Sequence, residues 1–379
     1  MSQPSEIDLN LLAHFAKISD PRSSKSQLHP LPSLIAIAVC AVICGADSWV
    51  AIADWAEAKE DWLRTFLDLP NGIPSHDTFG RVFALLHPDE FRDAFTAWTI
   101  GLAERTEGDI IAIDGKTLRR SFDRAAGRAA IHVVSAWSRL NGVALGQVAT
   151  EEKSNEIEAI PRLLKLLMLT GCIVTIDAMG CQTKIASMVV ERGGAYVLAV
   201  KDNQPHLSQD VQQVFDAGLE ANFEGIEHDF VSTEERGHGR TEVRNAWVIK
   251  DLSSIRNTSR WAGLQAIGMV EAERVVGDKH SVFHRFYISS IPDLDAATLL
   301  RATRSHWEIE NKLHWSLDVT FREDEARHRV GHAAENMNRL RAIALNLLRQ
   351  ETTAKVGLKI RRQRAGWDNG YLLRVLGVT

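Results

Sequence analysis

The chain has 379 residues, of which 45% are hydrophobic and 25% charged, so it can form a large folded core and is not a disordered protein. Its formal net charge of -5 excludes a protein that is basic throughout, so any nucleic-acid-binding surface must be local. The 4 cysteines form no CxxC pair, which argues against a zinc ribbon or a disulfide framework and favours a reducing cytosol.

Residues 1–106 predict an all-helical N-terminal domain, for DNA binding or for association with the rest of the chain. The longest apolar run, residues 31–49, is short for a bilayer and is interrupted by Gly45 and Asp47, so it predicts a buried helix and no membrane contact. The N-terminus lacks the pattern of a signal peptide. Helix-period apolar residues occupy segments 8–18, 31–45, 47–68, 76–86 and 89–106.

The pattern changes at about residue 107, where strands begin. The expected order over 107–202 is three strands, a helix, a strand, a helix and a strand, which is typical of an α/β fold. After one helix, residues 203–292 read mostly as strands and predict a β-rich insertion. The chain becomes helical again up to about residue 350. Residues 351–379, with the cluster "KIRRQR", predict a basic C-terminal tail suited to DNA-backbone contact.

Two of the strands end in an aspartate, "IIAID" at Asp114 and "IVTID" at Asp177. Functional groups gather at the carboxyl ends of strands in open α/β sheets, although each aspartate taken alone fits a loop residue or a helix cap equally well. In a helical projection of residues 299–317, Glu310 falls within the apolar stripe, whereas Glu308 falls on a solvated face beside Lys312. An inward carboxylate needs a partner, and two strand-end aspartates could share a cation with it.

Three carboxylates without a nearby cysteine suit Mg²⁺ or Mn²⁺. Two such ions can activate an attacking oxygen and stabilise a leaving oxygen in phosphodiester chemistry. Zinc held by His306 and His314 is disfavoured, because neither a cysteine nor an HExxH spacing accompanies them. His306 is expected either to orient Glu310 or to contact DNA.

Several segments in order resemble one family: "IAIDGKTLRRS", "VTIDAMGCQ", "YVLAVKDNQP", "ERGHGRTEVR" and "HWEIENKLHWSLDVTFREDEARHR". They are similar to the H-repeat-associated DDE transposases of bacterial insertion sequences, from about residue 8 to residue 350. The resemblance implies an RNase H-like catalytic core over 107–350, with the β-rich insertion at 203–292. It also implies Asp114, Asp177 and Glu310 as a catalytic triad that binds two Mg²⁺ or Mn²⁺ ions.

The resemblance further implies a cytoplasmic bacterial protein, associated with the nucleoid when bound. It would act as a homodimer on double-stranded DNA, cutting the element's ends and joining them to target DNA. Two alternatives stay open: a DNA-binding protein that has lost catalysis or been domesticated, and a metal-dependent nuclease without strand transfer. A strand-transfer assay separates the nuclease from a transposase.

The sequence departs from the related signature Y-x2-R-x3-E-x6-K, since Thr303, His306 and Leu317 stand at the Tyr, Arg and Lys positions. Trp307 and Trp315 are expected in the core, and Asp318 and Glu323 are candidate supports around the metal ligands. A solvated turn and a plain hairpin stand as alternatives for some of the DNA contacts. The candidate DNA contacts are Lys116, Arg119, Arg120, Lys201, Asn203, Gln204, His238, Arg240 and His306.

Overall fold

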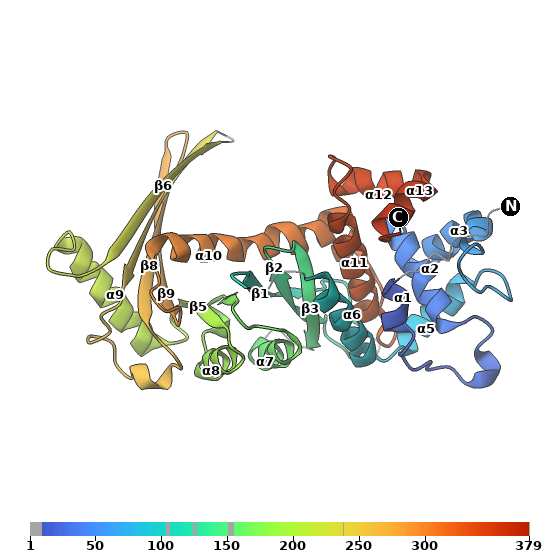
Figure 1. Ribbon diagram of the computed structural model, residues 1–379, viewed down its shortest axis with the longest axis horizontal. Helices are drawn as coiled ribbons and strands as arrows, with labels where there is room; N and C mark the ends of the chain where they lie inside the picture. Colours follow the sequence, from blue (N-terminus) through green and yellow to red (C-terminus); the bar gives the residue numbers. More distant parts are fainter. Residues whose placement is uncertain (1–9, 104–106, 124–126, 151–154, 238, 379) are drawn as a thin grey trace.

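The computed structural model describes residues 10–103, 107–123, 127–150, 155–237 and 239–378. Figure 1 shows an elongated molecule with a sheet whose far end rises as an arm, a long helix α10 running along it, and a group of helices at the opposite end. Within the described residues, no helix combines the length and apolarity needed to cross a membrane.

The N-terminal region is helical, as its apolar spacing predicts. Ser48 and Ser75 cap two of the helices by accepting hydrogen bonds from the N–H groups of Ala51 and Thr78. The helices are α1 (Asn10–Phe15), α2 (Leu31–Ile43), α3 (Trp49–Ala58), α4 (Glu60–Leu63), α5 (His76–Leu85) and α6 (Pro88–Leu102).

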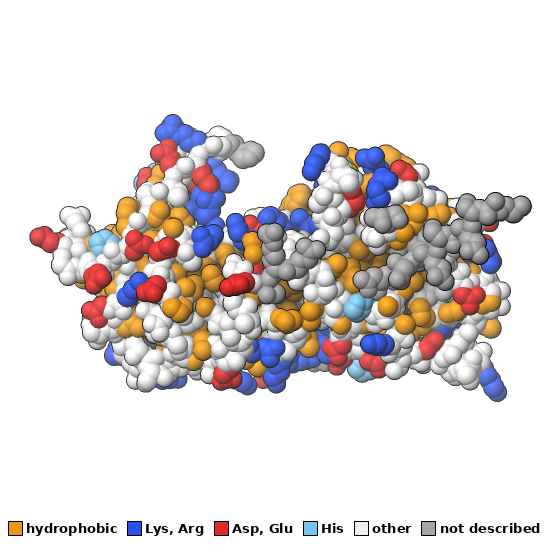
Figure 2. Space-filling model, viewed as in Figure 1, with side chains coloured by type: hydrophobic (Ala, Val, Ile, Leu, Met, Phe, Trp, Pro, Cys, Tyr) orange, Lys and Arg blue, Asp and Glu red, His pale blue; other side chains and the backbone are white. Residues whose placement is uncertain are grey.

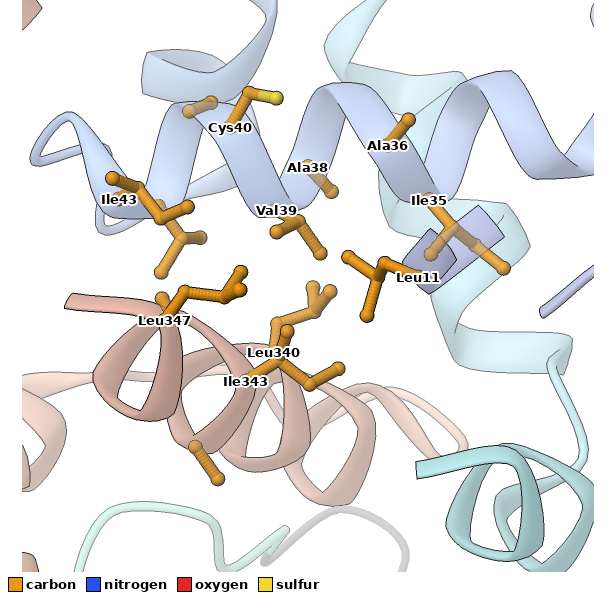
Figure 3. Packing of buried hydrophobic residues seen from close by; sticks show 14 of the residues in the cluster. Leu11, Ile35, Ala36, Ala38, Val39, Cys40, Ile43, Leu340, Ile343 and Leu347 are labelled. Carbon is orange, nitrogen blue, oxygen red and sulfur yellow. The ribbon is translucent and has the colours of Figure 1, made fainter. Parts of the chain in front are cut away.

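These helices share one core with the C-terminal helices α11 (Ala333–Gln350), α12 (Leu358–Trp367) and α13 (Asn369–Val375). Figure 3 shows α2 lying across α11, with Val39 and Ile43 facing Leu340 and Leu347. The apolar run of α2 is therefore buried by a helix from the far end of the chain, which explains why it reads as a core helix.

The C-terminal segment is not the free basic tail that the sequence predicts. Arg362 of α12 is 5% exposed and donates to the carbonyl of Val42 at 2.8 Å and to Asp47 at 3.1 Å. Its guanidinium lies over the ring of Phe321. One arginine of "KIRRQR" thus ties α12 to the N-terminal helices, so the segment predicted as a basic tail forms packed helices.

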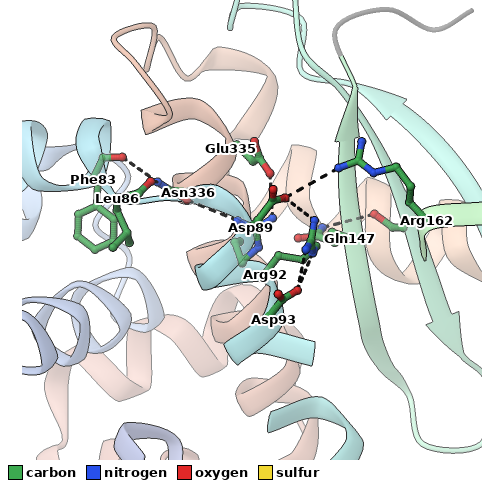
Figure 4. Close-up of polar contacts among 11 residues, drawn as sticks. Phe83, Leu86, Asp89, Arg92, Asp93, Gln147, Arg162, Glu335 and Asn336 are labelled. Carbon is green, nitrogen blue, oxygen red and sulfur yellow. Dashed lines mark hydrogen bonds and ion pairs between the residues drawn. The ribbon is translucent and has the colours of Figure 1, made fainter. Parts of the chain in front are cut away.

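Polar contacts also join the two ends of the chain (Figure 4). The buried Asn336 of α11 donates from Nδ2 to the carbonyls of Phe83 and Leu86, at 2.8 and 2.9 Å. These carbonyls end α5, where no further helical N–H group is available to them. Asn336 of α11 therefore supplies the hydrogen bonds that the carbonyl groups at the end of α5 would otherwise lack.

The described strands form one nine-stranded sheet in the order β3-β2-β1-β4-β5-β9-β8-β7-β6. β1, β4 and β5 are parallel, and the remaining neighbours pair antiparallel. The strands are β1 (Ile110–Thr117), β2 (His132–Ser138), β3 (Val143–Thr150), β4 (Ile173–Ile176), β5 (Ala195–Val200), β6 (Asp229–Gly237), β7 (Arg240–Ile249), β8 (Ala266–Val276) and β9 (Lys279–Ser289).

Helices cover both faces of the parallel part of the sheet. Apolar residues of one face pack against α7 (Glu156–Leu166), α8 (Thr183–Glu191) and α9 (Pro205–Glu220). The other face packs against α10 (Ala296–Glu308). This mixed sheet, preceded by a helical region, is the α/β fold with an RNase H-like core and a β-rich insertion that the sequence predicts.

The edge strand β3 is closed by the side chain of Asn346 from α11. Its Oδ1 accepts from the N–H of Ala144 at 2.8 Å, and its Nδ2 donates to the carbonyl of Ala144 at 2.9 Å. We expect Asn346→Leu to lower the free energy of unfolding by about 1–3 kcal/mol for each backbone group left unpaired. Urea unfolding measures this, and the exposed Gln350→Leu, which loses one contact to the carbonyl of Asn141, is the matched control.

Candidate active site

The strand register brings Asp114 and Asp177 side by side. Ile113 of β1 pairs with Ile176 of β4, so the residues that follow them are neighbours where the parallel pairing ends. Adjacent strands lie about 4.8 Å apart. Side chains alternate between the two faces, and Ile111 and Ile113 face α7 and α8, so Asp114 faces α10.

Glu310 lies directly after α10, at the start of a π-helical turn, Ile309–His314. Four residues before it, His306 Nδ1 lies 3.1 Å from the hydroxyl of Thr175 on β4. Four residues after it, His314 Nδ1 lies 3.5 Å from Asp114 Oδ2. Two histidines therefore fix the segment that carries Glu310 over the two strands that carry the aspartates.

Glu310 itself is exposed, which corrects the expectation that it is buried in the apolar stripe. Ile309, Leu313 and Leu317 occupy that stripe instead. The projection assumed a regular α-helix, whereas the π-helical turns shift the faces of the residues that follow. The prediction for Glu308 is confirmed, because Lys312 Nζ donates to it at 2.8 Å.

One cleft of about 390 Å³ contains all three carboxylates of the predicted triad. Asp114, Asp177 and Glu310 come from three separate elements of the fold and line it together. A further carboxylate, Asp202, and the predicted Lys201 also line this cleft. The geometry thus collects acidic side chains from distant parts of the chain in one open, solvent-accessible place.

Burial, together with the nearby carboxylates of Asp177 and Glu310, raises the pKa of Asp114 to about 7, against a hydrogen bond from the Gly115 N–H that lowers it. Such crowding of negative charge is what a bound cation relieves, and an all-carboxylate donor set suits a hard divalent ion. Within the described ranges, however, no three His, Cys, Asp or Glu side chains are arranged to hold one ion as they stand. The residues fit a divalent cation in kind, and their side chains would have to move closer to one another around it.

Sequence comparison with known families decides the relationship. The model for the "Transposase DDE domain" matches residues 105–347, and one described as "DDE_Tnp_1-associated" matches residues 12–99. The chain belongs to the DDE transposase family. The match spans the nine-stranded sheet, the residues that line the cleft and helix α10, so the fold described above is that of the family's domain.

Two relatives of this DDE transposase family member match it over nearly their full length. The "H repeat-associated putative transposase YhhI" of Escherichia coli K12 is 39% identical over 372 residues, covering 97% of each chain. The "Putative transposase YncI" of Escherichia coli O157:H7 is 42% identical over 371 residues, covering 97% of this chain and 94% of its own. A shorter relative, the "Inactive transposase YbfQ" of Escherichia coli K12, matches over 72 residues at 39% identity.

A buried pair supports Asp114 from behind in this DDE domain. His132 and Glu156, 2% and 5% exposed, contact each other through Nε2 and Oε1, and His132 Nδ1 lies 2.9 Å from the hydroxyl of Thr117. A Cβ at Gly115 would collide with both members of the pair. The glycine after the aspartate therefore lets this pair pack against β1 directly beneath the cleft.

Lys116 does not line the cleft, contrary to its predicted DNA contact. Its Nζ contacts the carboxylates of Asp318 and of the buried Glu323, the latter at 2.7 Å. Glu323 also accepts from Asn338 at 2.8 Å and lies 3.7 Å from Arg341. This buried network, built from the predicted support residues Asp318 and Glu323, fixes the end of β1 to α11.

The other predicted DNA contacts fall in different places. Arg119 is exposed and lies 3.3 Å from Asp324, and Arg120 is exposed outside the cleft. Asn203 and Gln204 donate to the carbonyls of Ala178 and Cys181, so they fix the loop after Asp177. His306 and Lys201 line the cleft. Arg240 lies at the start of β7, and His238 lies outside the described residues.

The expectation that Trp307 and Trp315 are core residues is wrong, since they are 43% and 58% exposed. Trp307 lines the cleft, and the guanidinium of Arg285 lies 4.9 Å from its ring. Sequence reasoning also missed Asp202 and the contact between His314 and Asp114. Asp202 was accessible from the sequence, because it lies two residues after the end of β5, the third parallel strand, and Asp177 directly follows β4, the second.

Proposed function

We propose that the protein is an active DDE transposase that cuts DNA at the ends of an insertion sequence and joins the freed ends to target DNA. The observation that carries the proposal is the gathering of Asp114, Asp177 and Glu310 in one cleft from three separate elements. Two ends must be cut together, so the proposal includes a homodimer bridged by DNA in the bacterial cytoplasm.

In the proposed site, Asp114, Asp177 and Glu310 would hold two divalent ions, Mg²⁺ or Mn²⁺. When bound, the ions stabilise the charge that develops on the attacking and leaving oxygens of a phosphodiester. His306 and His314 keep Glu310 and Asp114 in place through their contacts with β4 and β1. The exposed Lys201 lies at the rim, where its ammonium group neutralises a phosphate of the entering strand.

The chemistry consists of two similar displacements at phosphorus. In the first, the oxygen of water bonds to phosphorus, the bond to the 3′ oxygen breaks, and that oxygen leaves as a hydroxyl after taking up a proton. In the second, the same 3′ oxygen loses its proton to solvent and bonds to a phosphorus of target DNA. The bond from that phosphorus to the target strand's own 3′ oxygen breaks, and this oxygen takes up a proton and leaves as a hydroxyl. One cleft suffices for both steps because each is an in-line phosphoryl transfer.

Strand transfer from a precleaved end tests the reaction class. The substrate is a duplex from the DNA that flanks the gene, cut to leave a free 3′ hydroxyl, mixed with supercoiled plasmid and Mg²⁺. The proposal expects covalent joining of the labelled strand to the plasmid and none with EDTA. Metal-dependent nicking without joining would identify a nuclease instead.

A DNA-binding protein without catalysis is the second candidate. The observation on its side is that the acidic side chains of the described residues do not form a three-ligand cluster. For this candidate, DNA affinity is the same with and without Mg²⁺, and no cleavage product forms from any flanking sequence.

The role of His314 in holding Asp114 gives a separate prediction. Its Nδ1 faces Asp114, while its buried Nε2 has no hydrogen-bond partner among the described residues, so Nδ1 carries the proton in the neutral ring. The amide nitrogen of asparagine takes the place of Nδ1, and that of glutamine takes the place of Nε2. We expect His314→Asn to retain most of the Mg²⁺-dependent cleavage and His314→Gln to lose roughly tenfold or more. Equal rates for the two variants would contradict a role for Nδ1.

A further inference from the structure

The four strands β6–β9 extend beyond the body of the sheet as an arm, and their register divides its charges between two faces. Side chains alternate along each strand, so residues paired across strands share a face. We call the side toward α10 the inner face; it carries Arg240, Glu242, Arg244, Arg274, Phe283 and Arg285. The outer face carries Glu234, Arg236, Glu271, Glu273, His280 and His284.

The inner face and α10 enclose a groove of about 550 Å³, lined by five arginines and only two glutamates. The arginines are Arg240, Arg244, Arg274 and Arg285 from the arm and Arg304 from α10. Figure 2 shows Lys and Arg side chains following the side of the arm that faces the hollow above α10. A chain with a net charge of -5 thus concentrates positive charge along one groove.

Carboxylates in and beside this groove do not neutralise the arginines. Glu242 lies 2.9 Å from Arg240 and 3.8 Å from Arg274, and it also contacts Arg244, so a single carboxylate faces three guanidinium groups. Glu235 at the rim lies 2.6 Å from Arg304 and 3.1 Å from Arg244, so two carboxylates are shared among four guanidinium groups, and Arg285 adds a fifth. Glu273, the second glutamate of the lining, is bound to His280 at 2.6 Å on the outer face. The surplus of cations is therefore available to an anionic partner.

The groove and the acidic cleft are continuous, because Arg285, Tyr287, Thr303 and Trp307 line both. Phe283, which is 60% exposed on the inner face, adds an apolar surface beside the arginines. A repeating anion that runs along the groove and ends among the carboxylates must be charged along its length and carry flat, apolar groups. DNA has this chemistry, because its backbone carries a charged phosphate at every nucleotide and its bases are flat.

We propose that the inner face of the arm is a DNA-backbone-binding surface that leads the strand to be cut into the acidic cleft. This inference rests on the proposed action on DNA, and it moves the main contacts away from Lys116, Arg119 and Arg120. Arg240 and Arg274 near the tip and Arg285 at the junction are the contacts that it assigns. Since guanidinium groups bind phosphates without reading bases, the surface binds DNA of any sequence.

The test measures the affinity of a short fluorescein-labelled duplex of arbitrary sequence by anisotropy, over a series of salt concentrations and without divalent ions. We expect the double variant Arg240→Ala/Arg274→Ala to bind more weakly and to reduce the slope of log K against log salt by roughly 2, about one per lost phosphate contact. Arg285→Ala should reduce it by roughly 1. Arg236→Ala is the matched control, since it removes an arginine from the same arm on the outer face, where it is 78% exposed.

Wild-type affinity and salt slope in the inner-face variants would overturn the proposal, as would an equal loss in Arg236→Ala, which would show a general charge effect. Thermal unfolding of each variant checks that the arm remains folded.

The arm proposal and the proposed catalytic function can fail independently of each other. If Asp114→Asn removed cleavage while the arm variants bound normally, only the arm surface would be wrong. If no variant or wild type cut DNA but binding followed the inner face, only the catalytic function would be wrong.

Discussion

Replacing Asp114 by asparagine is expected to reduce Mg²⁺-dependent cleavage of element-end DNA roughly 10²–10³-fold, the scale on which removing one preorganised electrostatic group acts. The amide has nearly the same shape as the carboxylate but lacks its charge and one acceptor oxygen. It therefore leaves β1 and the His132–Glu156 pair undisturbed while weakening the cation site. Gel analysis of nicked plasmid that carries the gene's flanking DNA gives the rate.

The control for Asp114→Asn is Asp109→Asn at the other end of the same strand region. Asp109 is buried and accepts hydrogen bonds from Ser138 and the N–H of Leu140, far from the cleft lining. Asp109→Asn should lower the free energy of unfolding and leave the rate of DNA cleavage per folded molecule unchanged. Cleavage by Asp114→Asn at the wild-type rate would remove Asp114 from the proposed ligand set.

The second large effect is expected from Glu323→Gln, in the buried network behind the site. Although burial opposes ionisation, Lys116 and Arg341 hold the pKa of Glu323 below its usual value, so it is charged in the folded protein. Removing that charge leaves Arg341 buried at 2% exposure without its carboxylate. We expect the free energy of unfolding to fall by about 3–5 kcal/mol, the cost of breaking a buried ion pair.

Glu325→Gln provides the comparison for Glu323→Gln, because Glu325 lies in the same short turn, is exposed and pairs with Arg322 at the surface. Its replacement should leave the unfolding midpoint unchanged, since exposed ion pairs contribute little. Urea unfolding followed by tryptophan fluorescence measures both variants. Equal midpoints for Glu323→Gln and wild type would mean that the network does not fix β1 to α11.

The sequence predicts the sheet well because its strands are short apolar runs between glycines and because helices follow β3, β4 and β5. Asp114 and Asp177 could be placed together for the same reason, since parallel strands present their carboxyl ends at one edge. The position of Glu310 on the helical face was not predictable by a regular projection. The π-helical turn at Ile309–His314 changes the angle between successive residues, and the sequence carries no periodic signal for it.

Charged residues were the hardest to place from the sequence. Lys116 lies two residues after Asp114 and looked available to a phosphate, but its ammonium group is paired with Glu323, 207 positions later in the chain. "KIRRQR" read as a tail because α12 has few apolar residues, and its central arginine is buried by contacts with α2 and Phe321. In both cases the partner is distant in sequence, so local composition could not reveal that the charge is already paired.

The account depends on three carboxylates sharing bound cations, and a titration of Mn²⁺ by isothermal calorimetry tests this most directly. The account predicts two ions bound to the wild-type protein in the presence of DNA, and weaker or absent binding in each of Asp114→Asn, Asp177→Asn and Glu310→Gln. Glu308→Gln, two residues from Glu310 and outside the cleft lining, should bind as the wild type does. Unchanged Mn²⁺ binding in all three cleft variants would contradict the account.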